Sequence, residues 1–270
     1  MGKREKRNDL FVIVVIFLVA LLFENLETFS LIEDETLSYR QLLRTYNAAP
    51  ELTSPIDDIV IVYTDEEFYE EYDKYPLRRV DLSTILVRLK EMGAKVIAVD
   101  MLLDFKSAYG EDPSLEDALI EAGNVLLVSQ AQFENEKFVG VNYAIERFSK
   151  NTSNGYSNIS SNSAVSQSIV RLRVYPEISV TGEWPFAVEA VSQYLGIEPE
   201  FSGQNVLIGD LELSLDQFND LYIDYPLLPS DGDGGTAKLH DVVGLSAADL
   251  LFAEDEEELD EDYVVENSNY

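Results

Sequence analysis

The sequence contains no cysteine, and among its 270 residues there is one histidine, His240. The lack of cysteine excludes thiol catalysis, disulfide bridges and thiolate-bound metals. A single histidine excludes zinc sites built from several imidazoles. A catalytic triad with one histidine stays open, but His240 follows a turn rich in glycine and aspartate and no nucleophile motif accompanies it, so we expect an exposed loop residue.

Basic residues are also scarce: 19 lysines and arginines face 51 aspartates and glutamates, for a formal net charge of −32. Binding to phosphate backbones requires a basic face, so we expect no nucleic-acid partner. Such acidity is typical of high solubility or of a salty habitat. The hydrophobic share of 46% suffices for a packed core, and no change in composition divides the chain strongly.

One long apolar run is present, at residues 10–23, and Lys3, Arg4, Lys6 and Arg7 precede it. Its span of about 21 Å is shorter than a hydrocarbon core of about 30 Å and would also suit a signal peptide. However, no cleavage site of small residues follows. We therefore expect an uncleaved anchor, rather than a cleaved signal or a buried helix.

The charge order around this run predicts a basic cytoplasmic N-terminus at residues 1–9 and a transmembrane anchor at residues 10–29. The remainder would then lie outside the cytoplasm, so the expected location is a single pass through the cell (inner) membrane with the main domain extracytoplasmic or periplasmic.

Buried strands and amphipathic helices alternate in the next part of the chain. This order predicts an α/β fold with a mostly parallel or mixed central sheet flanked by helices. Asp81 is the expected cap of the first helix, and Pro113 suits the first turn of the second. The expected strands are residues 59–63, 95–99 and 125–128, the first being buried on both faces, and the expected helices are residues 81–93 and 112–123.

The second half is less regular. Residues 151–168 are rich in Asn, Ser and Gly and are predicted to form a loop. Residues 254–270 open with a dense acidic run and are predicted to be a solvated loop or tail. Between them we expect strands at 169–175, 206–208 and 221–224, and helices at 185–195 and 245–251.

Several short segments occur in an order that resembles the CHASE2 family of bacterial extracytoplasmic sensory domains. The resemblance covers most of residues 10–251, and its value lies in the order and spacing of the segments. After the apolar run these are residues 37–40 with Arg44, then 59–65, 75–78, 93–100, 123–127, 170–174, 222–225 and 246–251.

The resemblance implies a sensory domain at residues 30–253. Family members are input modules of receptors whose cytoplasmic output is a cyclase or a kinase, and a homodimer is compatible with this role. Two features depart from the family: Tyr75 stands where a tryptophan is usual, and the family's last apolar strand and later membrane helices are not found. We therefore expect a C-terminally truncated piece of a longer receptor.

Four residues are candidates for ligand binding: Asp65, Tyr75, Arg78 and Asp100. Asp65 and Asp100 each follow a predicted strand, and ligands of open parallel sheets bind beyond the carboxyl ends of strands. Arg78 suits an anionic ligand. The structural alternatives are that Asp65 caps a helical turn, that Asp100 pairs with a base such as Arg78, and that Arg78 forms an ion pair holding its loop.

These observations predict a sensor that binds an unknown small molecule or protein, with no catalytic residue, metal or cofactor. A metal-dependent extracytoplasmic hydrolase using Asp65 and Asp100 is the first alternative. A passive anchored scaffold without any ligand is the second.

Overall fold

The computed structural model of the chain describes residues 3–25, 36, 39, 59–135, 137–158, 161–162, 169–179, 181–217, 219–223, 227–228, 238–239 and 243–252. Two compact units divide the chain. The first comprises residues 1–54, 161–171 and 223–239, and the second comprises residues 55–160, 172–222 and 240–270. His240 and the predicted acidic tail at 254–270 lie outside the described residues.

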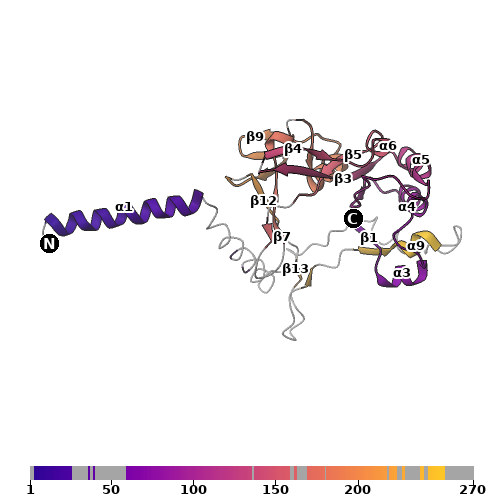
Figure 1. The fold of residues 1–270 in the computed structure, drawn as a ribbon, viewed down its shortest axis with the longest axis horizontal. Helices are drawn as coiled ribbons and strands as arrows, with labels where there is room; N and C mark the ends of the chain where they lie inside the picture. The colour runs from indigo at the N-terminus through magenta and orange to yellow at the C-terminus, as the bar shows by residue number, and fades with distance from the viewer. Residues whose placement is uncertain are drawn as a thin grey trace. The chain divides into compact units, whose positions relative to one another are not determined.

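The first unit contains one long helix, α1 (Lys3–Asn25), which is drawn in indigo in Figure 1. All side chains at residues 10–21 of this helix are exposed. Within the described residues, no helix combines the length and the apolar character needed to cross a membrane. Its described residues also form two short antiparallel pairings: β6 (Ser161–Asn162) with the start of β7 (Ile169–Arg173), and β13 (Leu227–Leu228) with β14 (Lys238–Leu239).

A parallel sheet forms the centre of the second unit. Its strand order is β2-β3-β5-β8, and β4 pairs antiparallel with the second half of β3. β2 and β3 are joined through α5, as the alternating pattern predicts. The strands are β2 (Ile97–Val99), β3 (Val125–Glu134), β4 (Lys137–Asn142), β5 (Ser153–Tyr156) and β8 (Trp184–Pro185).

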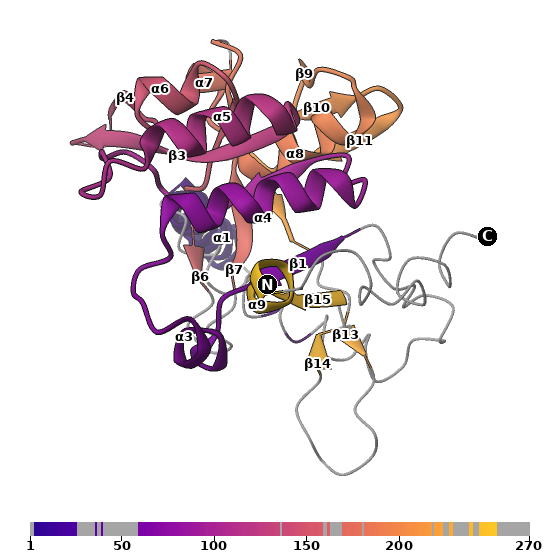
Figure 2. The ribbon, with the colours of Figure 1, turned by 90° about the vertical axis from the view of Figure 1, so that its right-hand side faces the viewer.

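Helices cover both faces of this sheet. On one face, α4 (Arg79–Glu91) and α5 (Asp112–Ala122) lie side by side (Figure 2) and bury Val125 and Leu127 of β3. The inner face of α5 consists of the residues expected from their spacing, Leu115, Ala118, Leu119 and Ala122. On the other face, α8 (Phe186–Leu195) packs against β5 and ends at Gly196, which has a positive φ of 70°.

The segment predicted as a loop at residues 151–168 contains β6 and also β5, an interior strand of the sheet, so that prediction is wrong for residues 153–156 and 161–162. For β5 the reason is a close approach of helix and strand. A Cβ atom at Gly155 would lie 2.7 Å from the Cα of Phe186 in α8. Glycine, which weakens strands in general, is therefore required at this point of this strand.

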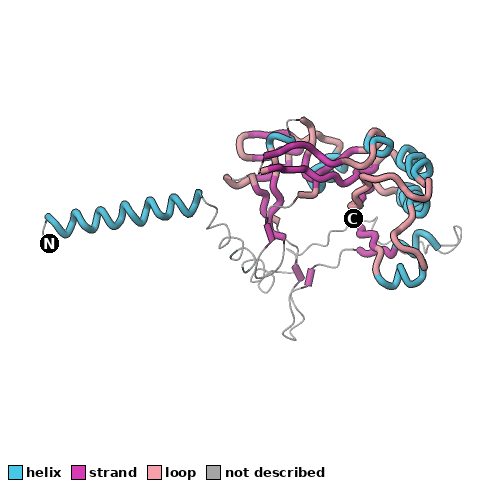
Figure 3. Tube along the Cα trace, viewed as in Figure 1, coloured by secondary structure: helices cyan, strands magenta, loops and turns pink. Residues whose placement is uncertain are grey.

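The strand at residues 59–63 forms as expected, but its predicted burial on both faces is wrong. β1 (Val60–Tyr63) pairs in parallel with β15 (Val243–Ser246) in a separate sheet, apart from the larger one (Figure 3). Val60 is 51% exposed and Ile61 is 48% exposed. The pairing partner comes from the other end of the chain, so β1 does not enter the sheet of β2 and β3.

A second hydrophobic cluster surrounds Trp184 and is built from Val174, Val188, Val206, Ile208 and Leu215. Nearby, Arg173 donates two hydrogen bonds to the buried Asp220, at 2.7 and 2.9 Å. The remaining elements of the unit are α3 (Glu66–Tyr72), α6 (Glu146–Ser149), α7 (Pro176–Ser179), β9 (Glu200–Ser202), β10 (Asn205–Ile208), β11 (Leu211–Ser214), β12 (Asp220–Tyr222) and α9 (Ala247–Phe252).

Candidate ligand-binding site

The segment between α3 and α4 carries two of the four predicted site residues, Tyr75 and Arg78. Asp73 ends α3 in the left-handed region at φ 51°, and the peptide bond between Tyr75 and Pro76 is cis. Leu77 is buried in the core cluster beneath α4. The segment is therefore held between two fixed points, while Tyr75 is 82% exposed.

Arg78 is fixed by an acid from the loop before α5. Its Nε donates to Oε1 of Glu111 at 2.5 Å, and its Nη2 donates to the same oxygen. This hydrogen bond raises the pKa of the Arg78 guanidinium. The side chain of Glu111 is 8% exposed and that of Arg78 is 38% exposed, so the carboxylate lies inside and the guanidinium retains an open side.

Glu111 also stabilises the N-terminal end of helix α4. Its Oε2 accepts a hydrogen bond of 3.1 Å from the backbone N–H of Arg79, the first residue of the helix. A carboxylate at this position satisfies a free N–H group and suits the positive end of the helix dipole. The prediction that Asp81 caps this helix is wrong, because the helix starts two residues earlier and Asp81 accepts a hydrogen bond from the hydroxyl of Tyr72.

Arg79 forms a second, more buried ion pair beside the first. It is 6% exposed and donates to Asp112 and to the carbonyl of Phe105. Its guanidinium also lies 5.2 Å from the ring centroids of Phe105 and Phe148. Two adjacent bases therefore pair with two adjacent acids, and this parallel spacing is the signal in the sequence from which the clamp between α4 and α5 could have been predicted.

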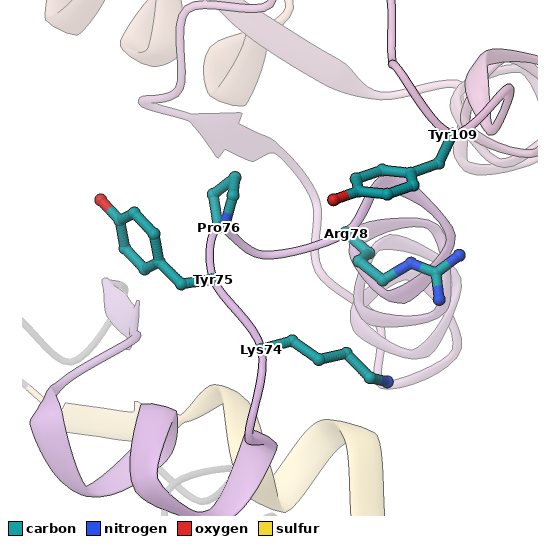
Figure 4. A pocket seen from close by; sticks show the side chains of 5 residues that line it. All are labelled: Lys74, Tyr75, Pro76, Arg78 and Tyr109. Carbon is teal, nitrogen blue, oxygen red and sulfur yellow. The ribbon is translucent and has the colours of Figure 1, made fainter.

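A pocket of about 210 Å³ opens beside this clamp, and its lining consists of Lys74, Tyr75, Pro76, Arg78 and Tyr109. The side chains of Lys74 and Arg78 extend in the same direction, with the Tyr109 ring over Arg78 and the Tyr75 ring on the other side of Pro76 (Figure 4). The Arg78 guanidinium lies 5.5 Å from the Tyr109 ring centroid. The pocket thus joins two cations to two tyrosine rings, one of them 82% exposed and the other 72% exposed.

Lys74 and Tyr109 were not predicted from the sequence. Tyr109 lies in the irregular connection between β2 and α5, which has no periodic pattern, and it reaches the pocket because α5 packs against α4. Lys74 is exposed and sits 5.0 Å from the ring centroid of Tyr72. Within the part of the chain that the structure describes, no acid forms an ion pair with Lys74.

The two predicted aspartates lie elsewhere. Asp65 caps α3, because its Oδ1 accepts a hydrogen bond of 2.8 Å from the backbone N–H of Phe68. Asp100 follows β2 and is exposed. Strand pairing does not bring them together, since β1 and β2 belong to different sheets, and neither residue lines the pocket. Among the described residues there is no cluster of three or more His, Asp or Glu side chains arranged to hold a metal ion.

Tyr72, the last residue of α3, lies at the base of the site. Its hydroxyl connects α3 to the start of α4 through two hydrogen bonds. It donates to Asp81 and accepts a hydrogen bond of 3.0 Å from the backbone N–H of Arg78. Burial, followed by the hydrogen bond to Asp81, raises the pKa of Tyr72 to about 12. The residue is therefore a neutral donor near neutral pH, and it fixes the backbone from which Arg78 extends.

Comparison with models of protein families matches residues 11–265 to the CHASE2 domain, which is nearly the whole chain. No curated protein and no solved structure was found to match the chain.

Proposed function

Because the chain belongs to the CHASE2 family, whose members are extracellular sensory domains, we propose that it is the membrane-anchored input domain of a signal-transduction receptor. It would bind a small ligand outside the membrane at the pocket beside Arg78. The output would be a cytoplasmic cyclase or kinase in the receptor to which the domain belongs.

The pocket is the observation that carries this proposal. Its lining comes from two connections, residues 74–78 and the loop containing Tyr109, which lead into α4 and α5. A ligand that contacts both connections would favour one arrangement of the two helices over another, which is what population shift in a sensor requires. A pocket lined by exposed aromatic and cationic groups favours ligand binding over a passive scaffold.

The proposed anchor is α1. Its residues 10–21 are apolar on all sides and exposed, as expected for a helix whose surroundings are not water. The preceding lysines and arginines favour an N-terminus that stays in the cytoplasm. With this orientation the second unit would lie outside the membrane.

The hydrolase that would use Asp65 and Asp100 gains no support from a specific contact. The carboxylate of Asp65 is engaged in capping α3, and Asp100 lies outside the lining of the pocket. We therefore propose a sensory function alone.

The proposal is tested by expressing the chain in a bacterium and measuring its fractionation and topology. We expect the protein in the membrane fraction after an alkaline wash, with the second unit digested by protease added to spheroplasts. Deletion of residues 1–25 should release the protein from the membrane, whereas deletion of residues 254–270 should not. Recovery of the intact chain from the cytosol would refute the proposed function.

A further inference from the structure

The charges around the pocket differ from those of the rest of the chain. The whole sequence carries 51 acids against 19 bases, yet the pocket lining contains two bases, Lys74 and Arg78, and no acid. From this, and resting on the function proposed above, we infer that the pocket binds a small organic monocarboxylate with a flat apolar body.

Donors for such a carboxylate are present in the pocket lining. Arg78 uses Nε and Nη2 for Glu111, and no hydrogen bond in the described part of the chain involves its Nη1. The Lys74 ammonium contacts the Tyr72 ring but no described carboxylate. Hydrogen bonds from a guanidinium and an ammonium to a carboxylate are charge-assisted and therefore stronger than those between neutral groups.

The local charge sets the charge of the ligand. Within the lining, the Arg78 guanidinium is paired with the carboxylate of Glu111, and Lys74 is the remaining positive charge; Asp81, which acts on Arg78 from outside the lining, holds its carboxylate on the Tyr72 hydroxyl. One carboxylate neutralises this charge. A phosphate dianion would leave an excess negative charge within a protein of formal charge −32, and the resulting repulsion disfavours it.

The rings define the rest of the ligand. Tyr75 and Tyr109 are largely exposed and both line the pocket, and Pro76 lies between them (Figure 4). Flat apolar groups gain from stacking on such rings. A volume of about 210 Å³ lies below the range of about 300–1,000 Å³ of sites for drug-sized ligands, so the site suits a small compound and not a polymer.

Benzoate is the probe for this inference, with benzamide as an uncharged compound of the same shape and inorganic phosphate as an anion without a ring. Binding to the full chain in detergent micelles would be measured by saturation-transfer NMR and by calorimetry, with empty micelles as the blank. We expect benzoate to bind with a Kd on the order of 1 mM, and benzamide and phosphate to bind at least about tenfold more weakly.

Variants locate the binding. Lys74→Gln should weaken benzoate binding about five- to tenfold, the loss expected for one charge-assisted contact at a partly exposed site. Tyr109→Ala should weaken it about threefold. Lys137→Gln, which removes an exposed lysine on β4, is the matched control and should leave binding unchanged. Far-UV circular dichroism confirms that each variant is folded.

Equal binding of benzoate and benzamide would overturn the inference, as would stronger binding of phosphate or equal losses in Lys74→Gln and Lys137→Gln. The inference would also be overturned if benzoate did not bind at concentrations well above 1 mM, the order of magnitude of the expected Kd. None of these results affects the fractionation and topology of the chain, so failure of the ligand class is distinguishable from failure of the proposed function.

Discussion

At the scale of single residues, Glu111 makes the contacts on which both the start of α4 and the position of Arg78 depend. Its two carboxylate oxygens serve different donors, the Arg78 guanidinium and the Arg79 backbone N–H. Among the described residues, the buried acids are Asp220 and Glu111, whose side chain is 8% exposed. Its role is therefore structural, and it leaves the outer side of Arg78 available to a ligand.

Replacement of Glu111 tests this role. Glu111→Ala should lower the free energy of unfolding by about 2 kcal/mol, because a partly buried guanidinium and a helix N-terminal N–H both lose their acceptor. Urea denaturation followed by circular dichroism measures the change. Glu121→Ala, which removes an exposed acid from α5, should stay within about 0.5 kcal/mol of the original protein. Similar losses in both variants would contradict the assigned role.

The raised pKa of Tyr72 predicts that the protein loses stability at high pH. Its pKa in the folded protein is about 12, against 10.0 for an unperturbed tyrosine. Between these values the unfolded chain releases the proton first, so stability is complete below about pH 10 and falls as the pH rises toward 12. Unfolding free energies at pH 8, 10 and 11 should therefore decrease less steeply in Tyr72→Phe than in the original protein.

The control for this comparison is Tyr109→Phe, which changes an exposed tyrosine and should keep the steep decrease. Burial also raises the pKa of Tyr156 and Tyr175, and both contribute to the pH dependence of every variant. At pH 8, Tyr72→Phe should be about 1 kcal/mol less stable, because two hydrogen bonds are lost. Identical pH slopes for the two variants would contradict the assignment.

At the scale of elements, β5 and α8 approach each other at Gly155 more closely than any side chain allows. Gly155→Ala should therefore force the strand and helix apart and lower the free energy of unfolding by about 1–3 kcal/mol. Gly140→Ala on β4, where a Cβ meets no atom within 4 Å, is the matched control and should be nearly neutral. Thermal unfolding measures both, and equal melting temperatures would contradict the close approach.

The same elements show what the sequence could and could not predict. α4, α5 and α8 follow from apolar spacing and from Pro113, Gly123 and Gly196 at their ends. β5 does not, because Ser153, Asn154 and Gly155 have the composition of a turn. Its strand conformation depends on pairing with β3 and β8, which a local pattern does not contain.

At the scale of the whole molecule, predictions that depend on distant segments were the ones that failed or fell short. The apolar run at residues 59–63 predicts a buried strand, yet β1 pairs with β15 from far along the chain and stays largely exposed. The site shows the same dependence on distant segments. Arg78 and Tyr75 could be proposed as site residues from their local sequence. Tyr109 could not, because packing of α5 on α4 brings it there, and Glu111, which is 33 residues from Arg78, was indicated only by the matching order of the two bases and the two acids.

The position of Trp184 has a spectroscopic consequence. It is the single tryptophan of the chain, it is 5% exposed, and its ring centroid lies 5.0 Å from that of Phe201 in the cluster around α8 and β10. Intrinsic fluorescence excited at the red edge therefore reports on that cluster alone, while the pocket adjoins the separate cluster containing Phe68, Tyr72 and Leu77. A shift of the emission maximum during unfolding would therefore mark the opening of the cluster around Trp184.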